Sequence, residues 1–370
     1  MITCIFDLRK RCFLNLKIFL VFVALFSGCK SDHGFKFSTS HILDLSKPDF
    51  FEDGYLSEIV DTSSIKKVEL EFSENAAIGD INKIIEFDDK IFVFDRFYSK
   101  KVIAFDLDGN FLYQVGRQGD GLGEYSGIAD FSINEYDKQI ILLDGGQILA
   151  YEMGKGTYVN SKKLNFQANR LQWMEDFYAF YSTDGDYQLI LTDSKFQNTM
   201  RYFKNIRHLF QPYQSFVLSP DHSLYFHLDL HDTIYKLRPE LLPEPGYIID
   251  YGTYNVTQED WKNIKLTDFD KIPSRFAAKR ITTRFFLRSD SHIYFTFMEN
   301  EQLFCVIYSE SSKNHLVFRN DKISNDITFS SNTDFPAVVA CNKAGDFIAF
   351  SQPENPQKNF VITKFRWKDF

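Results

Sequence analysis

The chain lacks a basic surplus and lacks any apolar stretch long enough to cross a membrane as a helix. Lys and Arg number 42 against 50 Asp and Glu, which gives a net charge of −8. An acidic chain without a basic cluster in its main part argues against nucleic acid as a partner. The run Ile18–Phe26 has only about nine residues, whereas a spanning helix needs about 20.

Cysteine is too scarce for a disulfide framework. Of the five cysteines, Cys4 and Cys12 lie in the N-terminal leader described below, and Cys29 directly follows it. Only Cys305 and Cys341 remain for the folded part, and two cysteines do not define a framework. They could pair in an oxidising compartment or stay as two buried free thiols, and the second interpretation is favoured.

The N-terminal leader has the order of a secretory signal peptide, which is basic, then apolar, then small residues. Leu25-Phe26-Ser27-Gly28-Cys29 resembles a bacterial lipobox, in which the leader is removed before the Cys and its thiol is lipidated. The resemblance predicts a signal peptide over residues 1–28 and a lipid-anchored tether and lead-in over residues 29–51. Removing the leader's four Lys/Arg and one Asp changes the net charge from −8 to −11. An ordinary signal peptide with an incidental Cys29 is the open alternative.

Long helical periodicity is almost absent, whereas aromatic residues are abundant. Forty Phe and 19 Tyr bring the aromatic content to 17%. This composition favours β-strands and excludes a disordered chain. Short apolar runs bounded by turn residues recur along the chain, and Asp108-Gly109 between two of them is a strong hairpin signal.

The apolar runs form a repeat. Candidate first strands of the repeats begin near Asp80, Ile128, Leu171, Ser215, Thr283 and Pro336. The starts are about 43 to 53 residues apart, except for one interval of about 68, and a propeller blade of four strands has a period of about 40–50 residues. Many runs are apolar at successive positions, as expected when a blade is covered on both faces. The sequence therefore predicts an all-β fold, a six-bladed β-propeller of four-stranded antiparallel blades over residues 52–370.

The long interval and the two ends of the repeat array complete this prediction. We assign the interval to a small helical insertion near residues 257–281, with helices at Gln258–Ile264 and Ser274–Ile281. Lys67–Phe72 (KVELEF) reads as a lone strand before the first repeat, and the last repeat is one strand short. An N-terminal strand that completes the last blade would close the ring and remove two exposed strand edges.

The segment Val102–Tyr125 (VIAFDLDGNFLYQVGRQGDGLGEY) ends in a glycine-rich loop. The loop residues are Gly116, Gly119, Gly121, Gly123, Glu124 and Tyr125. It resembles the loop G-x-x-G-x-G-x-G-E-[FY] of the six-bladed propeller lipoproteins of Bacteroidota, relatives of NHL-type propellers, with Leu122 where those proteins usually have Pro. The resemblance implies the fold and an envelope location, and carries over no catalytic residue. A strand follows the glycines instead of a helix, so we interpret them as a structural connection between blades and not as a phosphate loop.

Other motifs give no sign of a metal, a cofactor or a nucleophile. The spacing of His222, His227 and His231 fits no zinc pattern. Asp106-Leu-Asp108-Gly109 lacks the remaining ligands of a calcium loop, and no Gly-x-Ser-x-Gly elbow is present. We therefore predict no metal site and no cofactor.

A ligand would bind where loops from every blade meet. In a four-stranded antiparallel blade, the loops between the second and third strands emerge on the same face as the blade-to-blade loops. These second-to-third-strand loops are predicted to carry Arg96, Tyr98, Asp144, Asp184, Asp186, His231, Asp232, Glu299 and Glu301. We expect this largely acidic face to be the ligand face, and the alternative is that these residues form solvated turns.

Two functions remain open. The first is a non-enzymatic binding or scaffold lipoprotein of the bacterial cell envelope, monomeric and held to the membrane by its N-terminal lipid, on the periplasmic or surface side of the outer membrane. Its ligand would be a glycan, a peptide or a protein. The second is a hydrolase or lyase in which carboxylates around the channel bind a cation or act as acid and base. The sequence contains no catalytic constellation, which favours the first.

Overall fold

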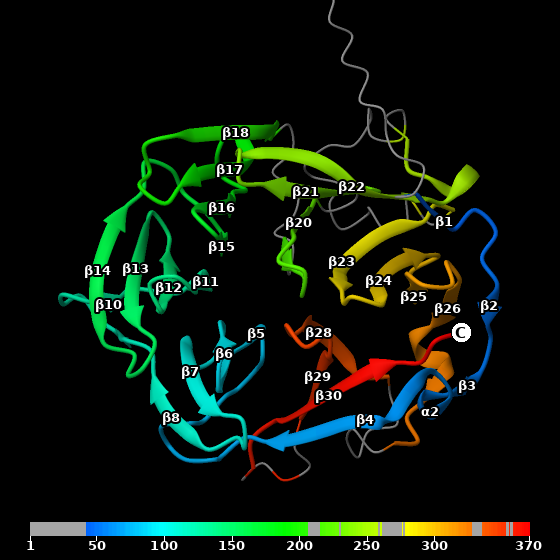
Figure 1. Cartoon of the computed structure of the whole chain (residues 1–370), viewed down its shortest axis with the longest axis horizontal. Coiled ribbons are helices and arrows are strands. Elements are labelled where there is room, and N and C mark those ends of the chain that lie inside the picture. Colours follow the sequence, from blue (N-terminus) through cyan, green and yellow to red (C-terminus); the bar gives the residue numbers. More distant parts are fainter. Residues whose placement is uncertain are drawn as a thin grey trace, which may run out of the picture. The chain divides into compact units, whose positions relative to one another are not determined.

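The computed structural model describes residues 42–205, 215–228, 231–257, 260, 276, 278–327, 335–352, 355 and 358–370, all within the second of the chain's two compact units. Six small antiparallel sheets stand around a ring in this unit, each with one strand at the centre and the others farther out (Figure 1). The predicted six-bladed β-propeller is therefore confirmed. The predicted signal peptide and Cys29 lie outside the described residues.

Blades are numbered here in chain order, with strands given from the inner to the outer edge. Blade 1 consists of β5 (Lys83–Phe87), β6 (Lys90–Asp95), β7 (Lys101–Asp106) and β8 (Phe111–Gln114). Blade 2 consists of β11 (Asp130–Asn134), β12 (Gln139–Asp144), β13 (Gln147–Glu152) and β14 (Tyr158–Lys163). Blade 3 consists of β15 (Arg170–Met174), β16 (Phe177–Tyr181), β17 (Tyr187–Asp193) and β18 (Thr199–Lys204). Blade 4 consists of β19 (Phe216–Leu218), β20 (Leu224–His227), β21 (Thr233–Arg238) and β22 (Leu242–Asp250). Blade 5 consists of β23 (Ile281–Arg288), β24 (His292–Glu299), β25 (Gln302–Ser309) and β26 (His315–Arg319). Blade 6 consists of β28 (Ala337–Cys341), β29 (Phe347–Ser351), β30 (Val361–Trp367) and β4 (Val60–Glu69).

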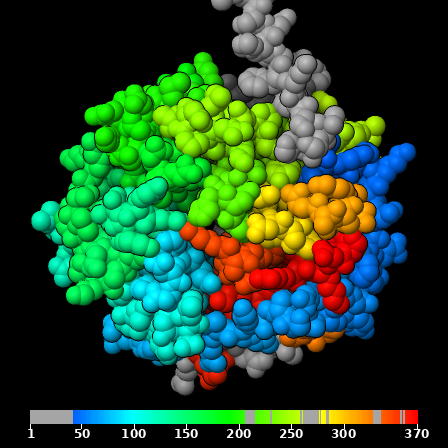
Figure 2. All heavy atoms as spheres, viewed as in Figure 1, coloured from blue at the N-terminus to red at the C-terminus, as the bar shows by residue number. Residues whose placement is uncertain are grey.

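The ring closes as the sequence predicts, because an N-terminal strand completes the C-terminal blade. Strand β4 is the outer strand of blade 6 and pairs antiparallel with β30, with Val68 opposite Ile362. It begins at Val60, earlier than the predicted Lys67, because residues 60 and 61 pair with Trp367 and Arg366 beyond a register shift. In Figure 2 the atoms of neighbouring blades meet around the ring, and side chains largely fill its centre.

The lead-in segment, residues 42–55, follows the outer edges of two other blades before it reaches blade 6. Strand β1 (Ile42–Asp44) pairs parallel with β22 of blade 4, and β2 (Phe50–Phe51) pairs parallel with β26 of blade 5. Strand β3 (Gly54–Tyr55) then pairs with β27 (Ile323–Ser324). The short helix α2 (Leu56–Ile59) leads into β4. The outer strands of blades 4 and 5 are therefore covered by a fifth strand.

The core consists of apolar layers between the blades, and successive apolar residues serve alternate layers. In β6, Ile91 and Val93 pack in the cluster shared with blade 6, whereas Phe92 and Phe94 pack in the cluster shared with blade 2. Side chains on a strand alternate between its two faces. An unbroken apolar run is thus what a strand needs when both faces of its sheet are covered, which explains the aromatic-rich composition.

The helical insertion predicted near residues 257–281 lies mostly outside the described residues. At its start, the backbone N–H of Asp260 donates a 3.3 Å hydrogen bond to Oγ1 of Thr257. At its end, Ile281 begins β23 and is not the last residue of a helix. Asp260 itself has α-helical backbone, within the predicted helix Gln258–Ile264. Apart from it, α2 is the only α-helix among the described residues, and no helix there has the length and apolar content to cross a bilayer.

Candidate functional site

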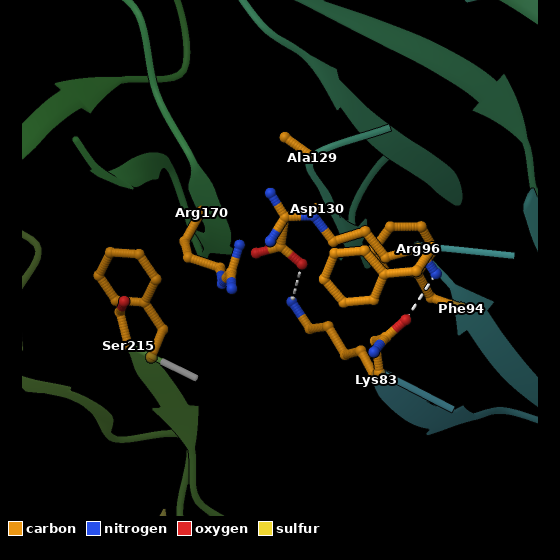
Figure 3. A pocket seen from close by; sticks show the side chains of 10 residues that line it. Lys83, Phe94, Arg96, Ala129, Asp130, Arg170 and Ser215 are labelled. Carbon is orange, nitrogen blue, oxygen red and sulfur yellow. Dashed lines mark hydrogen bonds and ion pairs between the residues drawn. The ribbon is translucent and has the colours of Figure 1, made fainter. Parts of the chain in front are cut away.

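A pocket opens at the centre of the ring, on the face where the loops between second and third strands emerge. Its lining comes from the inner strands of blades 1 to 4 and from one such loop. The lining residues are Asn82, Lys83, Phe94, Arg96, Phe97, Ala129, Asp130, Arg170, Ser215 and Phe216 (Figure 3). Its cavity volume is about 40 Å³. We call it the mouth pocket.

An ion pair between two inner strands forms its floor. Nζ of Lys83 at the start of β5 lies 3.0 Å from Oδ1 of Asp130 at the start of β11, and also donates to the carbonyl oxygen of Phe131 at 2.6 Å. The other carboxylate oxygen of Asp130 accepts the backbone N–H of Leu171 at 2.9 Å. Burial, reinforced by the charge of Arg170, lowers the pKa of Lys83, while Asp130 acts in the opposite direction. This carboxylate therefore has protein partners on both oxygens.

Two arginines add a positive surplus above this floor. In Figure 3 the side chains of Arg96 and Arg170 converge on Asp130 from opposite sides. Arg170 is 9% exposed. Burial, and then the charge of Arg170, lowers the pKa of Arg96, whereas Asp130 raises it. Three cationic side chains thus lie close to one carboxylate in a partly dehydrated pocket, where like charges repel more strongly than in water.

Aromatic rings form the wall next to these charges. The guanidinium of Arg96 lies 5.4 Å from the ring centre of Phe97, which is 59% exposed. Phe94 and Phe216 are buried and line the same pocket. A ligand entering the mouth would therefore meet positive charge at the centre and a flat apolar surface beside it.

The structure brings only one of the eight ligand-face candidates into the mouth pocket. That residue is Arg96, and Tyr98 beside it is 73% exposed. Asp184, Asp186, His231 and Glu301 are exposed on the loops of blades 3, 4 and 5. Three of these four residues are acidic, whereas the pocket at the centre is lined by Lys83, Arg96, Arg170 and one carboxylate.

Three further acidic residues of these loops are engaged by the protein. Asp232 accepts a 3.2 Å hydrogen bond from Oγ1 of Thr282, and Glu299 lies 3.3 Å from Nε of Arg280. Asp144 accepts the backbone N–H of Ser126 at 3.0 Å and so holds the loop between blades 1 and 2. These bonds give the three carboxylates a role in holding loops together.

Sequence reasoning missed Lys83, Asp130 and Arg170, although they share a position. Each is the first residue of an inner strand, where a polar side chain precedes an apolar run. Inner strands start at the face from which the second-to-third-strand loops emerge. The available signal was therefore a charged residue directly before the first apolar run of three successive repeats.

The glycine-rich loop connects blades 1 and 2, where it was expected. Gly116 and Gly123 have φ of +59° and +74°, which disfavours other residues. The carboxylate of Glu124 accepts the backbone N–H of Gly121 at 2.8 Å and pairs with Arg117 across the loop. The loop contains two short strands, β9 (Arg117–Gln118) and β10 (Glu124–Tyr125), which pair with each other. These bonds hold the loop together, as a structural connection between blades requires.

The histidines and cysteines are placed separately. His222 lies on the turn between β19 and β20, at the opposite end of β20 from His227, whose Nε2 is 3.0 Å from the carbonyl oxygen of His231. Across the described residues, no three His, Cys, Asp or Glu side chains gather closely enough to hold a metal. Cys305 and Cys341 are both free thiols.

The sequence and fold have relatives. A family described as a domain of unknown function (DUF4934) matches residues 49–363. A Bacteroides fragilis NCTC 9343 protein whose name describes it as exported is 13% identical with a TM-score of 0.65, over 87% of this chain and 100% of that chain. A virginiamycin B lyase from Staphylococcus aureus is 10% identical with a TM-score of 0.45, over 81% of this chain and 99% of that chain. At such identities the similarity concerns the fold alone. No curated protein matches the chain.

Proposed function

This chain belongs to the DUF4934 family, and we propose that it is a non-enzymatic binding protein whose mouth pocket takes a carboxylate group of its ligand. The observation that carries the proposal is the guanidinium of Arg96, which lines the pocket beside the ion pair of Lys83 and Asp130. Among the described residues, the guanidinium of Arg96 has no hydrogen-bond acceptor. A partly buried guanidinium without an acceptor is costly, and a bound anion would relieve that cost.

A carboxylate suits this site better than a neutral group. The planar guanidinium presents paired N–H donors that match the two oxygens of a carboxylate. The ring of Phe97 beside Arg96 can pack against the apolar part of the same ligand. The carboxylate could belong to an acidic sugar or to the C-terminus of a peptide.

The site gives less support to a hydrolase or lyase. Asp130 is the only carboxylate among the residues that line the pocket. Its oxygens accept hydrogen bonds from Lys83 and from the backbone of Leu171. An acid–base pair needs two groups that are free to exchange protons with a substrate.

We also propose that the protein is exported and lipid-anchored in the cell envelope. The leader over residues 1–28, Cys29 after Ser27-Gly28, and the resemblance of the glycine-rich loop to that of the Bacteroidota propeller lipoproteins support this. Acyl chains on Cys29 would hold the protein to a bilayer at about 0.8 kcal/mol for each buried CH₂ group. Cys29→Ala should move the protein from the membrane to the soluble fraction. Unchanged membrane association of that variant would contradict the anchor.

Calorimetric titration tests the carboxylate site. The probes are trigalacturonate, and trialanine with either a free or an amidated C-terminus. We expect one of the two carboxylate probes to bind, and Arg96→Ala to weaken it about tenfold, which is about 1.4 kcal/mol. Added salt should weaken binding as well.

Arg201→Ala is the matched control, because Arg201 is an exposed arginine on the outer strand β18 of blade 3. It should leave the affinity unchanged. If neither carboxylate probe binds, or if Arg96→Ala binds as well as the native protein, the mouth pocket is not an anion site.

A further inference from the structure

A second hollow lies on the opposite face of the ring, among the turns between the first and second strands of blades 2, 3 and 4. Its cavity volume is about 360 Å³, and its apolar residues are Tyr136, Trp173, Met174 and Leu218. We call it the turn groove. None of its lining residues belongs to the mouth pocket. A neighbouring hollow over the centre of the ring shares Glu135 and Leu218 with it, so the groove extends toward the channel.

An exposed tyrosine ring forms its most open surface. Tyr136 is 80% exposed, whereas Trp173, on the adjacent blade, is 4% exposed. The two rings meet edge to face with centres 5.9 Å apart. The buried tryptophan thereby sets the orientation of the tyrosine ring and leaves one of its surfaces to the solvent.

The turn that carries Tyr136 does not need an aromatic residue there. The side chain of Asn134 holds this turn, because its Nδ2 donates to Asp137 at 2.9 Å and its Oδ1 accepts the Asp137 backbone N–H at 3.1 Å. Tyr136 makes neither bond. Its ring contacts Trp173 on one side and is otherwise free to contact a ligand at the edge of the groove.

Polar groups that can accept hydrogen bonds surround the ring. Glu175 and His222 are exposed on the turns of blades 3 and 4. Glu135 is ion-paired with Lys343 at 2.6 Å. Among the described residues no cation pairs with Glu175, whereas the charge of Glu135 is balanced, so an anionic ligand would be repelled.

We propose that the turn groove binds a sugar ring of a neutral glycan. A pyranose has one face of C–H groups, which packs on an aromatic ring, and a rim of hydroxyl groups, which donate to carboxylate and imidazole acceptors. Tyr136 supplies the ring surface, and Glu175 and His222 supply the acceptors. The hollow shared through Glu135 leaves room for further sugar units toward the channel.

Titration with neutral hexasaccharides tests the groove. The probes are cellohexaose, mannohexaose and maltohexaose, followed by calorimetry and by the tryptophan fluorescence that Trp173 contributes. We expect at least one to bind below about 10 mM. Tyr136→Ala should weaken that probe about tenfold, and Tyr136→Phe, which keeps the ring, should bind within about threefold of the native protein.

Tyr98→Ala is the matched control, because Tyr98 is 73% exposed on the opposite face. It and Arg96→Ala should leave hexasaccharide binding unchanged, so this site and the mouth pocket are tested separately. The proposal is overturned if no hexasaccharide binds, if Tyr136→Ala binds like the native protein, or if only the peptide or trigalacturonate perturbs the fluorescence.

Discussion

The Nη1 atom of Arg280 donates a 2.8 Å hydrogen bond to the carbonyl oxygen of Leu45. The same guanidinium lies 4.4 Å from the ring centre of Tyr254 and 3.3 Å from the carboxylate of Glu299. Arg280 is 5% exposed. One buried cation therefore joins the lead-in segment to blade 5 and to one of its ligand-face loops.

Arg280→Met should destabilise the protein because it leaves the carbonyl of Leu45 and the carboxylate of Glu299 without this partner. We expect the free energy of unfolding in urea to fall by about 2–4 kcal/mol. Arg201→Met, at an exposed site on β18, should change it by less than about 0.5 kcal/mol. Equal effects of the two substitutions would show that Arg280 does not hold the lead-in.

Gly109→Ala should loosen the contact between blade 1 and the closing strand. Gly109 has φ of +90°, and a Cβ atom there would lie 2.2 Å from the carbonyl oxygen of Glu69 in β4. We expect a loss of about 1–3 kcal/mol in urea unfolding, from strain and from displacement of β4. At Gly127, a Cβ would meet nothing within 4 Å. Gly127→Ala should therefore be close to neutral, and a loss there as large as at Gly109 would contradict this reasoning.

Asp232 should make stability depend on pH. Burial, with a contribution from the charge of Asp250, raises the pKa of Asp232 to about 7, although Thr282 acts in the opposite direction. The folded state then binds a proton more tightly than the unfolded state, so stability falls as pH rises from about 4 to about 7. The loss is at most about 4 kcal/mol. Asp232→Asn should flatten this slope and raise stability at pH 8, as measured by urea unfolding across the pH range. An unchanged slope would exclude Asp232 as its source.

Asp130→Asn should have opposite effects on stability and on binding. It leaves the buried Lys83 without its counter-charge, which should lower the free energy of unfolding by about 1–3 kcal/mol. It also raises the positive charge of the mouth pocket, so a carboxylate probe should bind more tightly. Asp184→Asn is the control, because Asp184 is exposed on the same face and does not line the pocket. Weaker binding of the probe to Asp130→Asn than to the native protein would contradict the proposed electrostatics.

The ring and its closure could be predicted because both leave long signals in the chain. Each blade repeats a pattern over about 40–50 residues. Lys67–Phe72 was predicted as a single strand that lies before the first repeat and belongs to none of the repeats. Strands β1 and β2 could not be predicted, because they have three and two residues and no apolar alternation of their own. Their pairing depends on outer edges more than 200 residues later in the chain, such as Ile248 opposite Ile42.

The centre of the candidate site escaped prediction for a related reason. Sequence reasoning considered the loops, which are polar and easy to recognise. The pocket instead uses Lys83, Asp130 and Arg170, one from each of three blades, and only ring closure brings them together. Arg96 was found because it lies both on a loop and beside the channel.

The lead-in segment sets the order in which strands would detach if the N-terminal end of the chain were pulled. Tension on the chain before Ile42 would act first on the three-residue β1 at blade 4, then on the two-residue β2 at blade 5, and then on the two-residue β3 beside β27. Only after all three had detached would the load reach the ten-residue β4, on which closure depends. A propeller held by its N-terminal end can thus release three short strands while its six blades stay joined.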